Sequence, residues 1–301
     1  MPETSAPQRA PRPSTACVTT EALPRTHRML NPHAFLAPHR PTLLVDQQRG
    51  HHTPMLDAFG EATETFWGDR PEAVVVLSAR WTAESPFRVD ASRRHTTLTD
   101  YSGFGVEVRY DCDGHPALAR ALIESGKRAR VRVVASTRGA DSGVTVPLHF
   151  LVPRRDRPVV PISLPPASVA ECRAWGRALR ATLDAWPERV TFVVGGLLSC
   201  NEHAWNLRRE IPEVKAFDAA TLDALGRGAW DEIPPGGRDV LARARPEAGL
   251  RHLEVLRGLL GEGSSGVVRG YEESFGMGAA LVEFTRPASP AVAETAASGA
   301  V

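Results

Sequence analysis

The sequence predicts an α/β fold: a single domain in which a central mixed β-sheet is flanked by helices. Short apolar runs bounded by turn-forming residues alternate along the chain with longer segments whose apolar residues recur at helical spacing. The most apolar short run is residues 74–77, where three of the four residues are β-branched. Such a run is typical of a strand that is buried on both faces.

The strands are expected where apolar residues run together between turn formers. In chain order they are predicted at 34–37, 73–77, 131–134, 159–164, 190–194 and 277–284. Pro147 is expected to begin a helix within the apolar segment 144–152, because a proline cannot donate a hydrogen bond to a central strand.

The helices are predicted from helical spacing and from their first residues. Segment 53–67 places its apolar residues on one face, and segment 116–127 opens with Pro116, a favoured first helical residue. Segment 168–186 opens with Ser168 and Glu171, the spacing of a capping box. Two further helical patterns, the second rich in leucine, lie between residues 213 and 260.

The composition and charge of the chain argue against several classes of function. The formal net charge of the 301-residue chain is +1, which argues against a nucleic-acid or membrane-surface partner. No apolar run approaches the roughly 20 residues of a membrane span. The four cysteines form no CxxC pair, which argues against a disulfide scaffold or a structural zinc site. No signal peptide is visible, so a cytoplasmic location is expected.

The two ends of the chain differ in composition from the middle. Residues 1–30 and 286–301 are rich in proline, alanine and small polar residues and lack a hydrophobic period. They are expected to be disordered tails that flank one folded domain at residues 31–285.

Residues suited to chemistry follow several predicted strands. His39 follows the first strand between two prolines, Arg80 follows the strand at 73–77, and Cys200 follows the strand at 190–194. In an open α/β sheet the carboxyl ends of the strands face the ligand crevice. We therefore expect chemistry at residues 78–81, where Arg80 follows the strand at 73–77.

The order of short motifs along the chain resembles that of a known family. The motifs are Pro38-His39-Arg40-Pro41, Ser78-Ala79-Arg80-Trp81, Asp100-Tyr101-Ser102-Gly103-Phe104, Asp141-Ser142-Gly143, the Gly-Gly-x-x-Ser-Cys turn at 195–200 and the leucine-rich segment 253–261. Over about residues 31–285 this series resembles the class III extradiol ring-cleavage dioxygenases. That superfamily includes the catalytic β subunit of protocatechuate 4,5-dioxygenase and the DOPA 4,5-dioxygenases.

The resemblance implies an Fe(II) ion held by two histidines and one glutamate, a ligand set that leaves room for a catecholate and dioxygen. His39 matches the first histidine, and Glu254 is the expected match to the glutamate. The second histidine is replaced by Arg80, which cannot ligate a metal because its guanidinium stays protonated. Ser142 and Cys200 stand where the family has a second-sphere histidine and a proton-shuttling histidine. The cofactor is therefore either Fe(II) or none.

Several residues have more than one interpretation. Arg80 either binds a substrate carboxylate or fills the site by pairing with Glu254 or Asp141. Cys200 is either a reactive thiol, if its pKa is lowered, or a small buried residue. His39 and Glu254 are either ligands or an ordinary loop histidine and a paired carboxylate. Segment 100–104 either shapes a pocket wall or forms a turn. Other histidines are weak substitute ligands: His51, His52, His95, His203 and His252.

Two functions follow from these alternatives. In the first, the chain is an oxidoreductase that acts on a small catechol- or aminophenol-type aromatic substrate. It would use His39, Glu254 and an unmatched ligand such as His51 or His203. In the second, it is a non-catalytic subunit or binding protein that pairs with a catalytic dioxygenase chain. Such iron-free chains occur among the two-subunit aminophenol dioxygenases that the sequence resembles, whereas a chain acting alone could be a homodimer.

Overall fold

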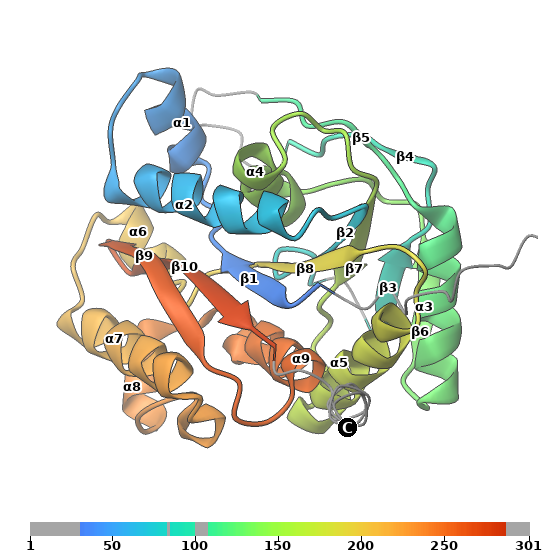
Figure 1. Ribbon diagram of the computed structural model, residues 1–301. Helices are drawn as coiled ribbons and strands as arrows, with labels where there is room; N and C mark the ends of the chain where they lie inside the picture. The colour runs from blue at the N-terminus through green and yellow to red at the C-terminus, as the bar shows by residue number, and fades with distance from the viewer. Residues whose placement is uncertain (1–30, 83–84, 100–107, 287–301) are drawn as a thin grey trace, which may run out of the picture.

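A single mixed sheet organises the computed structural model, which describes residues 31–82, 85–99 and 108–286 (Figure 1). Within these residues eight strands lie in the order β6-β3-β7-β2-β8-β1-β10-β9. They are β1 (His33–Ala37), β2 (Ala73–Ser78), β3 (Phe87–Asp90), β6 (Val133–Ser136), β7 (Val159–Ser163), β8 (Val190–Gly195), β9 (Gly266–Ser274) and β10 (Met277–Thr285). The expected tail at 1–30, the expected tail at 286–301 apart from Arg286, and the segment 100–104 lie outside the described residues.

The centre of the sheet is parallel and its margins are antiparallel. Strands β7, β2, β8 and β1 run parallel, whereas β10 is antiparallel to β1 and β9 is antiparallel to β10. On the other side β3 is antiparallel to β7 and parallel to β6. A separate short pair is formed by β4 (Arg94–His95) and β5 (Cys112–Asp113). The predicted mixed sheet is confirmed.

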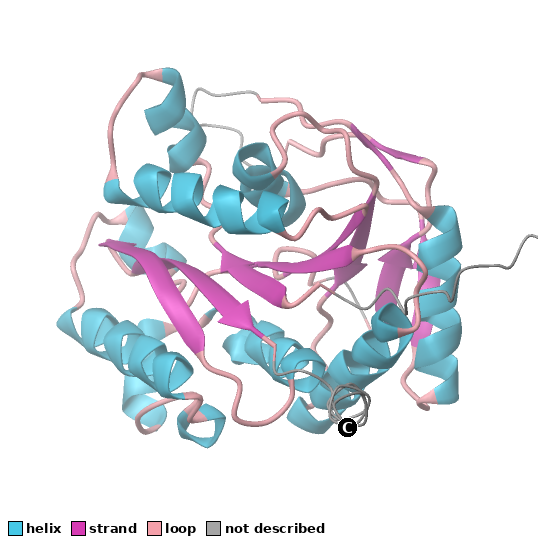
Figure 2. Ribbon diagram, in the orientation of Figure 1, coloured by secondary structure: helices cyan, strands magenta, loops and turns pink. Residues whose placement is uncertain are grey.

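Helices cover both faces of the sheet (Figure 2). Helices α2 and α4 lie on one face, and α3, α5, α7 and α9 lie on the other. The helices are α1 (Thr42–Gln48), α2 (Pro54–Gly68), α3 (Pro116–Arg128), α4 (Ser142–Leu151), α5 (Val169–Asp184), α6 (Glu202–Asn206), α7 (Pro212–Arg227), α8 (Arg238–Ala244) and α9 (Arg251–Leu260), with 3-10 turns η1 (Trp230–Glu232) and η2 (Glu247–Leu250).

Strand β2 is buried along its whole length, as its β-branched sequence predicts. Val74 and Val76 contribute to the core beneath α2 and α4, whereas Val75 and Leu77 contribute to the core beneath α5 and α9. Side chains alternate across a strand, so an unbroken apolar run supplies both cores at once.

Some elements differ from the sequence-based expectations. Pro147 lies inside α4 rather than at its start, and the carbonyl of Gly143, four residues earlier, packs against Gly195 at the end of β8. Strands β3 and β9 and helix α6 were not predicted. Strand β9 is a sheet edge with only partly buried residues, so its sequence lacks the continuous apolar run that marks β2.

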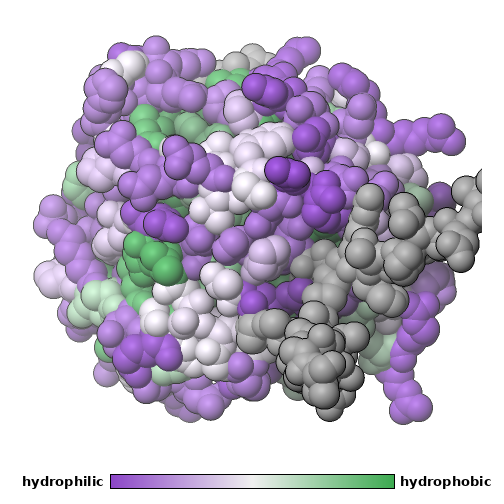
Figure 3. Space-filling model, viewed as in Figure 1, coloured by the Kyte–Doolittle hydropathy of each residue, from purple (hydrophilic) through white to green (hydrophobic). Residues whose placement is uncertain are grey.

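The exposed face in Figure 3 is mostly hydrophilic, with hydrophobic residues in small separate patches. Among the described residues, none of the helices has both the length and the apolar character needed to cross a bilayer.

The crossing of α5 and α9 depends on two glycines. A Cβ atom on Gly176 would lie 2.0 Å from the carbonyl oxygen of Val255, and one on Gly258 would lie 2.3 Å from that of Arg173. Side chains at these positions would force the two backbones apart, so the small residues set the distance between the helices.

We expect Gly176→Ala to lower the free energy of unfolding by about 1–3 kcal/mol, because the added methyl group overpacks a rigid contact. Gly60→Ala in α2 is the matched control, since no atom lies within 4 Å of its added Cβ. It should raise stability by roughly 0.5–1 kcal/mol. Urea unfolding followed by circular dichroism measures both changes. Equal effects at the two positions would contradict the assigned role of Gly176.

Candidate functional site

Four of the predicted site residues meet in one cavity at the carboxyl edge of the parallel strands. His39 follows β1, Arg80 follows β2, Ser142 begins α4 and Cys200 follows β8. All four line a cavity of about 270 Å³. The walls of the cavity also include Arg40, Thr42, Leu197, Glu202, Trp205 and Met277. Residues that follow three parallel strands therefore meet at one cavity.

A buried ion pair lies at the cavity wall. His39 Nε2 is 2.8 Å from Glu247 Oε1 and 3.0 Å from Oε2, and both residues are buried. The backbone N–H of Leu197 donates a second hydrogen bond to Glu247 Oε2 at 2.6 Å. Glu247 thus connects the loop after β1 to the turn after β8.

The two partners shift each other's protonation. Burial disfavours the charged form of each group, but their mutual attraction outweighs it. The pKa of His39 is therefore raised, and the pKa of Glu247 is lowered. Arg80 opposes the rise in the pKa of His39, which places its positive charge close to the imidazole.

A strained segment holds Glu247 against His39. Ala248 and Leu250 have positive φ angles of 48° and 58°, in a region that non-glycine residues rarely adopt. Such residues cost on the order of 1–3 kcal/mol each and persist only where surrounding structure holds them. Here the backbone N–H of Glu247 donates to the carbonyl of Leu198, and that of Cys200 donates to the carbonyl of Arg245.

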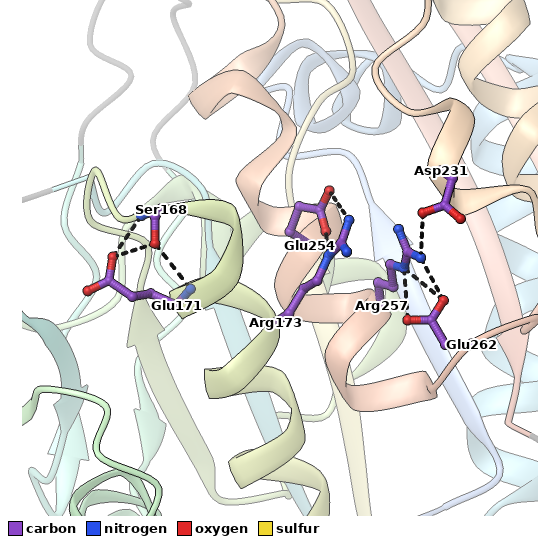
Figure 4. A network of polar contacts seen from close by, with 7 residues as sticks. All are labelled: Ser168, Glu171, Arg173, Asp231, Glu254, Arg257 and Glu262. Carbon is purple, nitrogen blue, oxygen red and sulfur yellow. Dashed lines mark hydrogen bonds and ion pairs between the residues drawn. The ribbon is translucent and has the colours of Figure 1, made fainter.

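Glu254 lies elsewhere, which corrects the expectation that it joins His39. Its side chain pairs with Arg173 of α5, with 2.5 Å between Nε and Oε2 (Figure 4). It belongs to a polar network between α5 and α9, next to the pairs that Arg257 forms with Asp231 and Glu262. Glu247, seven residues earlier, is the carboxylate that faces His39, because the left-handed turn at 248–250 separates it from the helix.

Arg80 stands between the cavity and the protein surface. Its side chain is about one third exposed, and Nη1 lies 3.7 Å from Glu202 Oε1. The alternative partners that the sequence suggested have other contacts: Asp141 accepts hydrogen bonds from Ser78 Oγ and Arg138 Nη1, both at 2.7 Å, and Glu254 pairs with Arg173.

The donor set does not fit the iron site that the resemblance implies. His39, Cys200 and Glu202 are the residues of metal-ligating type that line the cavity. The His39 imidazole bonds to Glu247, and the Cys200 thiol has a raised pKa. Arg80 supplies no lone pair. Across the described ranges, no group of three histidine, cysteine, aspartate or glutamate side chains is arranged to hold a metal ion. His51 and His203 are exposed and do not line the cavity.

Cys200 and Ser142 lie at the cavity without the histidine chemistry of the family. Burial, followed by the charges of Glu247 and Glu202, raises the pKa of the Cys200 thiol to about 12. A reactive thiolate requires a lowered pKa, and the pKa of Cys200 is raised instead. Ser142 is buried at the first position of α4, beside Asp141.

Sequence reasoning missed Arg40, Glu247 and Trp205. Arg40 shares the loop of His39 between two prolines, and that proximity was a usable signal. Glu247 follows Pro246 in a segment without periodicity, so nothing in the sequence separates it from Glu254. His252, considered as a weak substitute ligand, is fully buried, and neither of its ring nitrogens has a hydrogen-bond partner among the described residues.

Residues 33–284 match the family described as the catalytic LigB subunit of aromatic ring-opening dioxygenase. The chain belongs to the LigB family. The predicted resemblance to the class III extradiol dioxygenases is therefore confirmed for almost all of the folded part of the chain.

Two curated relatives carry dioxygenase names. The chain is 26% identical over 210 residues to the 4,5-DOPA dioxygenase extradiol of Beta vulgaris, covering 66% of this chain and 74% of that protein. It is 30% identical over 165 residues to the dioxygenase tasH of Hapsidospora irregularis, covering 52% of this chain and 50% of that protein.

The crystal structure of the uncharacterized protein JW3007 from Escherichia coli K12 has a similar fold. Its TM-score is 0.64 at 20% identity, and the match covers 85% of this chain and 99% of that one. This likeness supports the fold alone.

We expect the His39–Glu247 pair to stabilise the protein most between about pH 4.5 and 6.5. The raised pKa of His39 gives stability that is present below 6.5 and lost as the pH rises through the folded-state value. The lowered pKa of Glu247 gives stability that is present above 4.5 and lost as the pH falls.

Urea unfolding of His39→Gln tests this dependence. At pH 5.5 the variant should lose about 3–5 kcal/mol, because Glu247 is left buried without its cationic partner. At pH 9 the loss should be smaller. His51→Gln, in an exposed pair with Asp46, is the control and should change little at either pH. A loss for His39→Gln that does not vary with pH would contradict the prediction.

We expect Cys200 to react slowly with N-ethylmaleimide in the native protein. With a pKa of about 12, about one thiol in 10⁴ is ionised at pH 8. Unfolding in urea should restore the ordinary pKa and increase the labelling rate by orders of magnitude. Peptide mass spectrometry measures the rate, with Cys200→Ser as the control for peptide assignment. Equal rates in the native and unfolded protein would refute a buried neutral thiol.

Proposed function

We propose that this chain binds a small aromatic compound in the cavity beside His39 and Arg80, as a non-catalytic subunit or binding member of the LigB family. The position of Arg80 carries the proposal. Its guanidinium lines the cavity with His39, where the family resemblance expects the second histidine ligand. A cation there replaces the positive charge of a metal but not its coordination chemistry.

The shape and walls of the cavity favour a single aromatic ring. Trp205, Leu197 and Met277 supply apolar surface, whereas the arginines and Glu202 supply polar groups. A volume of about 270 Å³ lies near the lower end of the range for small-molecule sites, roughly 300–1,000 Å³. Membership of a family described by aromatic ring opening supports the same class of ligand.

Metal content separates binding from iron-dependent ring cleavage. Wild-type protein reconstituted anaerobically with Fe(II) should retain no iron above background after desalting, as measured by elemental analysis. Arg80→His should gain up to about one iron per chain, because it adds the missing imidazole beside His39 and Glu247. Arg80→Gln is the control, since it removes the charge without adding a ligand.

Ligand binding is measured in parallel by calorimetry in the presence of a chelator. Single-ring aromatic compounds should bind the wild-type protein without metal. About one iron per wild-type chain, lost in His39→Ala, would overturn the proposal and favour ring cleavage. An absence of aromatic binding to the chelated protein would also overturn it.

A second candidate, ring cleavage by the chain itself, is favoured by one observation. His252 is buried and unpaired, and burial lowers its pKa to about 4, so its imidazole is neutral at pH 7 as a metal ligand must be. Its side chain would have to turn to join the other donors, and iron bound by the wild-type protein but lost in His252→Ala would support this candidate.

A further inference from the structure

Two neighbouring residues leave buried polar atoms without partners at the same cavity. Among the described residues, Nε and Nη1 of Arg40 and Oγ1 of Thr42 are covered from solvent and have no hydrogen-bond partner. Both residues line the cavity that contains His39 and Arg80. Buried polar groups are normally paired, so unpaired ones at a cavity call for a partner that binds there.

The Arg40 guanidinium lies over an aromatic ring. Its central carbon is 5.7 Å from the centre of the Trp205 ring, within the range of a cation–π contact. The carboxylates of Glu272, Asp46 and Glu273 act on it only at longer range, and burial outweighs them, so the pKa of Arg40 is lowered. The nearby acids therefore do not compensate the buried charge.

Arg40 differs from Arg80 in this respect. Arg80 has Glu202 3.7 Å away and is about one third exposed. Arg40 is partly buried, and no carboxylate among the described residues lies within salt-bridge distance of it. Of the two cations at the cavity, Arg40 therefore has the greater need of an anion.

The chemistry of the two side chains selects the anion. A guanidinium matches the planar carboxylate group, to which it can donate two parallel hydrogen bonds. A threonine hydroxyl can donate one more. The Trp205 ring beside Arg40 offers a flat apolar surface for the rest of the ligand.

We infer that Arg40, assisted by Thr42, is the carboxylate-binding residue of this cavity, and that the ligand is an aromatic acid whose ring packs near Trp205. Recognition then depends on the carboxylate and not on a pair of ring hydroxyls. The inference rests on the proposed function, because it names the class of ligand for the same cavity.

Calorimetry with matched ligands tests the inference. Benzoate and benzamide have the same ring and differ in charge, and catechol has the ring hydroxyls without the carboxylate. With a chelator present, wild-type protein should bind benzoate at least about tenfold more tightly than benzamide or catechol. Arg40→Gln should weaken benzoate about tenfold or more and leave benzamide nearly unchanged.

Two further variants and a stability measurement separate recognition from folding. Arg40→Lys should recover part of the benzoate affinity, because it restores the charge without the bidentate geometry. Arg49→Gln, at an exposed position after α1, controls for general loss of positive charge and should have no effect. Arg40→Gln should not lower the melting temperature, because it removes a buried charge that has no ion-pair partner.

The outcomes distinguish the inference from the proposed function. Three results would overturn the inference and leave aromatic binding standing. They are equal binding of benzoate and benzamide, tighter binding of catechol than of benzoate, and an Arg40→Gln variant that binds all ligands more weakly and melts at a lower temperature. Failure of every aromatic compound to bind the wild-type protein would overturn both.

Discussion

The buried pair of His39 and Glu247 is the interaction on which the site depends. It joins the loop after β1, the turn after β8 and the strained turn before α9, which lie far apart in the sequence. A carboxylate with two hydrogen-bonded partners tolerates burial, whereas either partner alone would be an uncompensated charge. The pair therefore fixes three segments around the cavity and explains why the left-handed backbone at 248–250 persists.

Two pairs of opposite charge lie at or beside the cavity, His39 with Glu247 and Arg80 with Glu202. Glu247 balances His39 within the wall, and Arg80 lies where a second imidazole is expected from the family resemblance. Arg80 lies 3.7 Å from Glu202, and Arg40 adds a further positive charge to the cavity wall. The chain thus has the fold of the LigB family with two arginines at the cavity.

The helix layer behind the sheet is held by a different kind of contact. Helices α5 and α9 approach closely at Gly176 and Gly258, and ion pairs such as that of Arg173 with Glu254 bridge them (Figure 4). Glu254 therefore connects two helices, whereas Glu247 of the preceding turn bonds to His39. Residues 247–254 therefore contribute to the site through Glu247 and to the contact between α5 and α9 through Glu254.

Sequence alone determined the α/β class and the central buried strands such as β2, because apolar periodicity is a local feature. The order of its motifs also led us to expect Arg80 at the position of a family histidine. Only the tertiary structure decided which glutamate bonds to His39. The choice between Glu247 and Glu254 depends on a left-handed turn that no local sequence pattern predicts. The tertiary structure alone placed Arg40 over Trp205, a contact across 165 positions of the chain, since burial and partner choice arise from packing rather than from the residues themselves.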